Sequence, residues 1–344
     1  MSADPGMTQM FREAADAPAC IARQGEAVAA RLGSLGRILS EMSPRLVVTV
    51  ARGSSDHAAT YAKYLIETMT GVPVASFAPS IGSVYRAPTR LSGTLCLAIS
   101  QSGRSPDIVA AARNAREGGA TVVAMVNDDA SPLAAAAHHV LPLQAAPETA
   151  VAATKSYLAS LAMVARMVAA WSGDAELAAR LATLPEAMRQ AWALDWSAAG
   201  PRADPARSLF VIARGLGLAV AAEAALKLKE TCRVHAEAYS AAEVLHGPAA
   251  IVGPGFPVLA LAQDDDTAAS VSATASRLAQ MGARVTIVGA VAAGCTQLPS
   301  VSGDPRLQPI LLAQSFYRLV NRWAVAAGHN PDRPPHLSKV TETT

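Results

Sequence analysis

Charged residues are scarce in this sequence, and its cysteines lack the spacing of a metal or disulfide site. Of the 344 residues, 16% are charged and 51% are hydrophobic, and the formal net charge is +2. Such a chain can bury a large core and is not expected to be disordered. So small a net charge gives no reason to expect nucleic acid as a partner. The four cysteines are far apart, which is typical of a reduced, cytoplasmic protein: Cys20, Cys96, Cys232 and Cys295.

Leader and membrane signals are also missing. The opening stretch MSADPGMTQMFREAADAP has no basic region followed by an apolar one. The longest apolar run, at 251–262, contains Gly253, Pro254, Gly255 and Pro257, so it cannot span a bilayer. We therefore expect a globular cytoplasmic protein with no membrane partner. No HExxH or CxxC spacing is present, so we expect neither a metal nor another cofactor.

What the sequence does contain is an internal repeat. RLVVTVARGSSDHAATYAKYL begins at Arg45, and SLFVIARGLGLAVAAEAALKL begins at Ser208. Both read as an apolar strand, then Ala-Arg-Gly, then a helix. A second pair of matching segments follows, in which Ser100-Gln101 corresponds to Gln263-Asp264. Matching order and spacing at two landmarks indicate a duplicated unit.

Each half alternates apolar strands with helices, which predicts parallel sheets covered on both faces. The expected fold is α/β, with two tandem doubly wound parallel-sheet domains. We expect a helical N-terminal arm at 1–39, a first domain at 40–200 and a second at 201–327. A C-terminal tail at 328–344 completes the chain.

The turn SQSGRS at 100–105 carries three hydroxyls, an amide and a glycine between a strand and a helix. In a doubly wound sheet, ligands bind beyond the carboxyl ends of strands. Convergent N–H groups and a helix N-terminus favour an anion there. Because GxxxxGK[ST] and GxGxxG are absent, a phosphate monoester fits better than ATP or a dinucleotide. The alternative is an ordinary serine-rich capping turn.

The corresponding turn of the second half, at 263–266, is acidic and would repel phosphate. We therefore expect one phosphate site, in the first domain. The second half has a charged span, LKLKETCRVHAEAYSAAEVLHGP at 226–248, in an otherwise charge-poor chain. Glu230 could move a proton between adjacent carbons, and a histidine could protonate a ring oxygen. The alternative is a solvated helix face with a structural histidine.

Five segments together resemble the sugar isomerase (SIS) family: ARGSSDH, SQSGRS, EAALKLKE, HAEAYSAAEVLHGP and HLSKVTE. The likeness extends from about residue 10 onward. It is strongest to the isomerase half of glucosamine-6-phosphate synthase and to the SIS-type glucosamine-6-phosphate deaminases. ARGSSDH and PPHLSKVTET resemble the deaminase branch more closely.

The resemblance implies a role for each matching position. Glu230 would shuttle a proton between C1 and C2, with Lys227 beside it. His246 would open the sugar ring, reaching it from the neighbouring subunit of a homodimer with shared active sites. Lys339 would form a Schiff base with the open-chain sugar, although alone it reads as a solvated tail residue. The sugar phosphate would be held by Ser54, Ser55, Ser100, Gln101, Ser102 and Ser105, and by the backbone at Val151 and Ala153.

Two positions depart from the synthase pattern. Arg52 stands where the synthase commonly has cysteine, and Leu245 stands where it tends to have lysine. No glutaminase half is expected, because only some 40 residues precede the first predicted strand.

The function expected from the resemblance is a deaminase and isomerase, which converts glucosamine-6-phosphate and water to fructose-6-phosphate and ammonia. Four alternatives stay open. The substrate could be galactosamine-6-phosphate or fructosamine-6-phosphate, the enzyme could be a glutamine-independent aminotransferase-like isomerase, or the protein could be a non-catalytic sugar-phosphate sensor.

Overall fold

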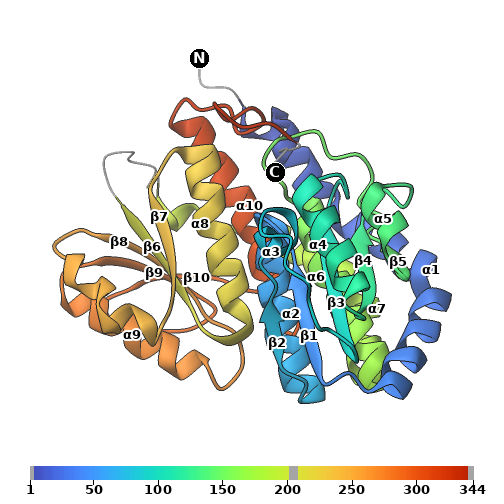
Figure 1. Cartoon of the computed structure of the whole chain (residues 1–344). Coiled ribbons are helices and arrows are strands. Elements are labelled where there is room, and N and C mark those ends of the chain that lie inside the picture. Colours follow the sequence, from blue (N-terminus) through green and yellow to red (C-terminus); the bar gives the residue numbers. More distant parts are fainter. Residues whose placement is uncertain (1–3, 201–207, 340–344) are drawn as a thin grey trace. The chain divides into compact units, whose positions relative to one another are not determined.

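A computed structural model of the chain describes residues 4–200 and 208–339 (Figure 1). These residues divide into two compact units that are not continuous in sequence. The first-sheet unit contains residues 17–148, 155–185 and 338–339. The second-sheet unit contains residues 4–16, 149–154, 186–200 and 208–337. The domain bounds expected from the sequence follow continuous stretches instead, and they stay a prediction.

The first-sheet unit is built on five parallel strands in the order β2-β1-β3-β4-β5. Their bounds are β1 Leu46–Val50, β2 Val74–Ser76, β3 Thr94–Ser100, β4 Thr121–Val126 and β5 His139–Pro142. All seven residues of the central strand β3 are buried, as expected for a strand with helices on both faces of its sheet.

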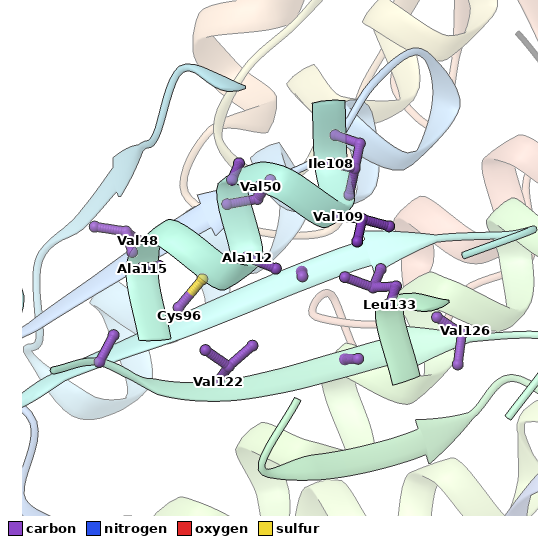
Figure 2. Packing of buried hydrophobic residues seen from close by; sticks show 14 of the residues in the cluster. Val48, Val50, Cys96, Ile108, Val109, Ala112, Ala115, Val122, Val126 and Leu133 are labelled. Carbon is purple, nitrogen blue, oxygen red and sulfur yellow. The ribbon is translucent and has the colours of Figure 1, made fainter. Parts of the chain in front are cut away.

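One face of this sheet is covered by small apolar side chains of α4 (Figure 2). Alternate strand residues such as Cys96 and Val122 lie beneath Ala112 and Ala115. The remaining strand residues point to the opposite face, where α2 and α6 pack against each other. The helices assigned wholly to this unit are α2 Ser54–Thr70, α3 Pro79–Ser83, α4 Pro106–Glu117, α5 Pro132–Ala136 and α6 Lys155–Ser172.

Two long helices contribute residues to both units. Helix α1, Gln9–Met42, changes unit after Asp16, and helix α7, Ala175–Ala193, changes unit after its internal Pro185. The N-terminal helix expected from the sequence is therefore present.

The second-sheet unit repeats the topology of the first. Its parallel strands have the order β10-β9-β8-β6-β7, with β6 Leu209–Ala213, β7 Ala236–Ser240, β8 Pro257–Leu261, β9 Arg284–Val288 and β10 Thr296–Leu298. Numbered from the first strand of each unit, both sheets read 2-1-3-4-5. Helices α8, Leu218–Cys232, and α10, Gln308–Ala326, pack against each other, and α9 is Ala268–Gln280. Short 3₁₀-helices complete the chain: η1 Pro5–Met7, η2 Ser197–Ala199, η3 Gly215–Gly217, η4 Glu243–His246 and η5 Pro248–Ile251.

The repeat extends to side-chain contacts within each unit. Arg52, after β1, donates from Nε to Asp107 in the first turn of α4 at 3.0 Å. Arg214, after β6, donates to Ser270 Oγ in the first turn of α9 at 2.7 Å. The expected fold, two tandem doubly wound domains with a helical N-terminal segment, is confirmed.

Within the described ranges, no helix is both long and apolar enough to cross a membrane.

Candidate active site

The sequence-predicted phosphate residues lie where the strand order of the first-sheet unit reverses. From β1 the chain moves outward to β2, whereas β3 is followed by β4 and β5 on the other side. In open α/β sheets this switch point is where ligands bind, beyond the carboxyl ends of the strands. Ser54 and Ser55 open α2 directly after β1, and Ser100 is the last residue of β3. Both polar turns therefore lie at the carboxyl ends of two adjacent parallel strands, β1 and β3.

The turn after β3 is folded on its own serines. Ser100 Oγ accepts the Gly103 N–H at 3.1 Å, and Ser102 Oγ accepts the Arg104 N–H at 3.3 Å. Gly103 has a φ of +63°, and a Cβ at this position would lie 2.2 Å from Ser131 Oγ. Only glycine meets both the backbone angle and the close approach.

The capping alternative can be compared with the hydrogen bonds of these serines. Ser105 occupies the N-cap position of α4, yet its side chain accepts no capping hydrogen bond from that fully described helix. Ser100 and Ser102 use acceptor lone pairs in the turn, so their O–H protons can still point to a ligand. Ser100 is 7% exposed, and Gln101, Ser102 and Ser105 are partly exposed. The arrangement suits an anion with several acceptor oxygens.

Arg52 links the two polar turns. Its Nε lies 3.0 Å from Asp107 Oδ2; the Arg52 side chain is 56% exposed, and that of Asp107 is 2% exposed. The pair joins the start of α4 to the turn after β1 and leaves the Arg52 guanidinium partly exposed beside both turns.

The tail lysine is paired with a carboxylate that the sequence reasoning missed. Lys339 Nζ lies 2.8 Å from Oε2 of Glu148, whose side chain is fully buried. Ser156, at the start of α6, donates to the same carboxylate from its backbone N–H at 3.1 Å and from its hydroxyl at 2.6 Å. One signal was available, because Glu148 is the only acidic residue between Asp129 and Asp174. The rest of the HLSKVTE motif, from residue 340 onward, lies outside the described residues.

The charged span of the second-sheet unit forms a buried ion-pair chain on α8. Lys227 is 0% exposed, and its Nζ lies 3.3 Å from Glu223 Oε1 and 2.5 Å from Glu230 Oε2. Tyr317 of α10 donates to Glu223 at 2.9 Å. Burial alone lowers the pKa of Lys227, but the two carboxylates outweigh it and hold the pKa above its usual value. Lys227 is therefore a fixed ammonium rather than a free amine.

Glu230 is the solvent-accessible member of these ion pairs. Its side chain is 19% exposed, whereas Glu223 is 1% exposed. The interpretation of the span 226–248 as a merely solvated helix face is wrong for Lys227, which is buried together with Glu223 one turn before it. The neighbouring Lys229 is exposed, as that interpretation expects.

His246, Val151 and Ala153 also belong to the second-sheet unit. His246 ends η4 and is exposed to solvent. The Val151 N–H donates to the Asp332 carbonyl at 3.1 Å, so Val151 can offer a ligand its carbonyl but not its amide. Ala153 is partly exposed.

The acidic turn of the second half is satisfied by its own surroundings. Asp265 accepts the Thr267 N–H at 2.8 Å and the Gln263 amide at 2.9 Å. Asp264 accepts the Gln308 side-chain amide at 2.7 Å. Three carboxylates in one turn offer a phosphate no donors comparable to those at 100–105.

The predicted site residues thus fall into two groups, each described within its own unit. The phosphate serines and Lys339 belong to the first-sheet unit. Lys227, Glu230, His246, Val151 and Ala153 belong to the second. Among the described residues, no group of three or more His, Cys, Asp or Glu side chains is placed to hold a metal ion.

Comparison with known families decides the relationship that the motifs suggested. A model of the SIS domain matches residues 42–170 and 204–292, one match in each half of the chain. The chain belongs to the SIS domain family.

Two similar proteins differ in how much of their length this chain covers. The glutamine–fructose-6-phosphate aminotransferase (isomerizing) of Aeropyrum pernix is 35% identical over 315 residues, which cover 86% of this chain and 50% of that protein. The SIS chain described here thus spans about half the length of the curated relatives it matches. A proposed phosphosugar isomerase from Silicibacter pomeroyi DSS-3 is 44% identical in its crystal structure. That likeness has a TM-score of 0.90 and covers 95% of this chain and 100% of the other.

A second solved structure shares the fold alone. The glucosamine-6-phosphate deaminase of Thermotoga maritima is 19% identical with a TM-score of 0.78, and the match covers 98% of this chain and 100% of that one.

Proposed function

We propose that this SIS protein is an amino-sugar-phosphate deaminase and isomerase. The reaction is glucosamine-6-phosphate plus water to fructose-6-phosphate plus ammonia, without a metal, nucleotide or other cofactor. At the coarser level, a phosphosugar isomerase of the SIS type, the proposal is supported by the family match and by the relative from S. pomeroyi. The deaminase branch is supported by the form of the motifs ARGSSDH and PPHLSKVTET.

The proposal rests on the placement of Glu230. A general base for a C–H proton must be positioned and accessible. Lys227 Nζ lies 2.5 Å from Glu230 Oε2 and fixes the position of this side chain, and the 19% exposure of Glu230 leaves its carboxyl group within reach of a ligand. In the proposed reaction, Glu230 takes the proton from C2 of the open-chain amino sugar and returns it to C1. Lys227 remains protonated throughout.

The other residues serve the steps around this transfer. The hydroxyls at 54, 55, 100, 102 and 105 and the Gln101 amide hold the phosphate, and the backbone at Val151 and Ala153 contacts the sugar. His246 protonates the ring oxygen as the ring opens. After the proton transfer, Lys339 attacks the C2 imine and displaces ammonia, forming a Schiff base that water hydrolyses to fructose-6-phosphate and free lysine. To act as the nucleophile, its ammonium must first give up a proton, whether or not it leaves Glu148.

We also propose a cytoplasmic homodimer in which His246 serves the neighbouring subunit. The exposure of His246 supports this arrangement. A mixture of inactive His246→Asn and Glu230→Gln proteins tests it, because hybrid dimers would contain one intact site. Activity restored on mixing supports a shared site, and a mixture as inactive as its components contradicts one.

The reverse direction has support of its own, since the curated relatives are isomerizing aminotransferases. A substrate panel separates the two. Purified protein is supplied with glucosamine-6-phosphate, galactosamine-6-phosphate or fructosamine-6-phosphate, and released ammonia is measured by a coupled assay. A parallel reaction contains fructose-6-phosphate with glutamine or with excess ammonium.

We expect ammonia from glucosamine-6-phosphate, and synthesis only with excess ammonium. No ammonia from any of the three sugars would refute the deaminase proposal. Glucosamine-6-phosphate formed from fructose-6-phosphate and glutamine would point to the aminotransferase.

A further inference from the structure

A buried carboxylate at the start of α1 holds the loop to which the proposed function assigns sugar contacts. Glu13 is 2% exposed, although most charged residues of this helix lie at the surface. Its Oε1 accepts the Thr149 N–H at 2.6 Å and the Thr149 hydroxyl at 3.2 Å. Its Oε2 accepts the Ala150 N–H at 3.2 Å. All these residues belong to the second-sheet unit.

The next amide of the loop is also taken by the protein. The Val151 N–H donates to the Asp332 carbonyl at 3.1 Å. The Asp332 carboxylate in turn caps α1 by accepting the N–H groups of Gln9 at 2.8 Å and Met10 at 2.7 Å. Three consecutive loop amides, at residues 149, 150 and 151, are thus fixed by α1 and by the segment that caps α1.

The start of α1 is itself held in place, so Glu13 is a rigid support. Gln314 of α10 donates to the Ala14 carbonyl at 2.9 Å, and both Gln314 and Asn321 are fully buried. Thr8 donates to Asn321 Oδ1 at 2.7 Å. A side chain on so well anchored a helix can fix the position of a loop that has no regular structure of its own.

The hydrogen bond between Glu13 and the Ala150 N–H constrains the loop strongly because both residues are buried. Ala150 is 1% exposed, so its N–H cannot exchange Glu13 for water without movement of the loop. A buried N–H left without an acceptor is unfavourable, and a charged acceptor makes the stronger bond. Truncating Glu13 therefore forces the loop to rearrange rather than to stay in place with unsatisfied amides.

We propose that Glu13 is a positioning residue, which fixes the 149–151 backbone so that Val151 and Ala153 can contact the sugar moiety of the substrate. This inference rests on the proposed function, because that function assigns the sugar contacts. Glu13 touches no reacting atom. It sets affinity for the sugar moiety, whereas the proposed function assigns the phosphate to the turn 100–105.

The affinity for sugar phosphates can therefore be compared with the affinity for inorganic phosphate. A purely structural role of Glu13 would not change the first affinity while leaving the second unchanged. Wild type, Glu13→Ala, Glu13→Gln and the control Glu26→Ala are compared, since Glu26 is an exposed carboxylate of the same helix. Calorimetry measures the Kd for glucosamine-6-phosphate, fructose-6-phosphate and inorganic phosphate. Amide hydrogen exchange follows residues 149–151.

In Glu13→Ala we expect the Kd for both sugar phosphates to rise by about tenfold, the effect of about one lost hydrogen bond to a charged group. The Kd for inorganic phosphate should stay unchanged, and exchange at residues 149–151 should become faster. Glu13→Gln should fall between, because its amide oxygen can replace one acceptor only. It also serves as the test if the alanine protein does not fold.

Two results would overturn the inference in a protein whose wild type is active. One is unchanged sugar-phosphate affinity in the Glu13 variants, and the other is an equal loss of affinity for inorganic phosphate. Wild-type protein that binds inorganic phosphate but neither sugar phosphate would refute the proposed function, and the inference with it.

Discussion

At the residue scale, the candidate active site contains a few buried charges, although the chain has few charges in all. Lys227 is one of them. Its ammonium is 0% exposed and would be unfavourable alone, but Glu223 and Glu230 supply two opposite charges. Their combined effect raises the pKa of Lys227, so its contribution to stability is present below the unfolded-state pKa, throughout neutral pH. That contribution is lost only as the pH rises through the folded-state value.

Replacing this lysine should destabilise the protein strongly. Lys227→Met leaves Glu223 buried without its ammonium, and we expect the free energy of unfolding to fall by about 3–5 kcal/mol. The matched control is Lys229→Met, an exposed lysine on the same helix, for which we expect a change within about 0.5 kcal/mol. Urea denaturation measures both. Equal effects of the two substitutions would show that the ion-pair chain contributes no special stability.

A second residue-scale prediction concerns the phosphate turn. Ser102→Ala removes one hydroxyl donor, and we expect KM for the sugar phosphate to rise about tenfold to a hundredfold, as for a lost hydrogen bond to a charged group. Ser92→Ala, at an exposed position before β3, is the control. Steady-state kinetics compare the two. The assignment fails if Ser102→Ala keeps the wild-type KM.

At the scale of elements, turns and strand edges position these residues. Gly103 lets the turn after β3 pass close to Ser131, whose hydroxyl caps α5 by accepting the Ala134 N–H at 3.3 Å. The phosphate turn and the next βα connection are therefore packed against each other at one point.

This contact predicts a difference between two glycine substitutions. Gly103 and Gly93 have φ angles of +63° and +72°, so alanine at either position costs about 1–2 kcal/mol for backbone conformation. Only at Gly103 would a Cβ collide, 2.2 Å from Ser131 Oγ. We expect Gly103→Ala to lose inorganic-phosphate affinity at least about tenfold, with Gly93→Ala unchanged. Calorimetric titration decides, and equal affinities in the two variants would show that the turn tolerates the displacement.

We expect the edge of the first sheet to respond to pH through His138. His138 lies just before β5. Its imidazole Nδ1 accepts the Val122 N–H at 2.9 Å, and its backbone N–H donates to the Val122 carbonyl. Burial, together with the nearby charges of Arg116 and His139, lowers the pKa of His138. Protonation at Nδ1 removes the acceptor, so the stabilisation is present above pH 6.5 and is lost as the pH falls through the folded-state pKa.

We therefore expect the Val122 amide resonance to titrate with a midpoint below pH 6.5, and His139→Gln to raise that midpoint. An NMR pH titration provides both numbers. A midpoint at or above 6.5 in the wild type would contradict the role assigned to His138.

At the scale of the whole molecule, the duplicated architecture was the most predictable feature. Apolar strands, polar turns and the repeated Ala-Arg-Gly are local signals, and their constant spacing predicts two sheets of the same topology. The serines to which we assign the phosphate could be proposed for the same reason, since all lie in two short turns at strand ends.

Two long-range pairs among the candidate residues could not be predicted in this way. Lys339 and Glu148 are 191 positions apart, and Glu13 and Thr149 are 136 apart. Each pair joins a single carboxylate to a distant group, with no periodicity that marks the partner. The burial of Lys227 could not be predicted either, because a charged residue at helical spacing is typical of a solvated face.

The central claim is that Glu230 moves a proton between C1 and C2 of an amino-sugar phosphate. The most direct test supplies glucosamine-6-phosphate to wild type, Glu230→Gln and the exposed-carboxylate control Glu186→Gln, without glutamine, and measures ammonia, fructose-6-phosphate and C1 or C2 hydrogen exchange with solvent. We expect wild type and Glu186→Gln to release ammonia and fructose-6-phosphate in equal amounts. We expect Glu230→Gln to bind the substrate with wild-type affinity but to give neither product nor hydrogen exchange. Exchange and product formation at the wild-type rate in Glu230→Gln would contradict the central claim.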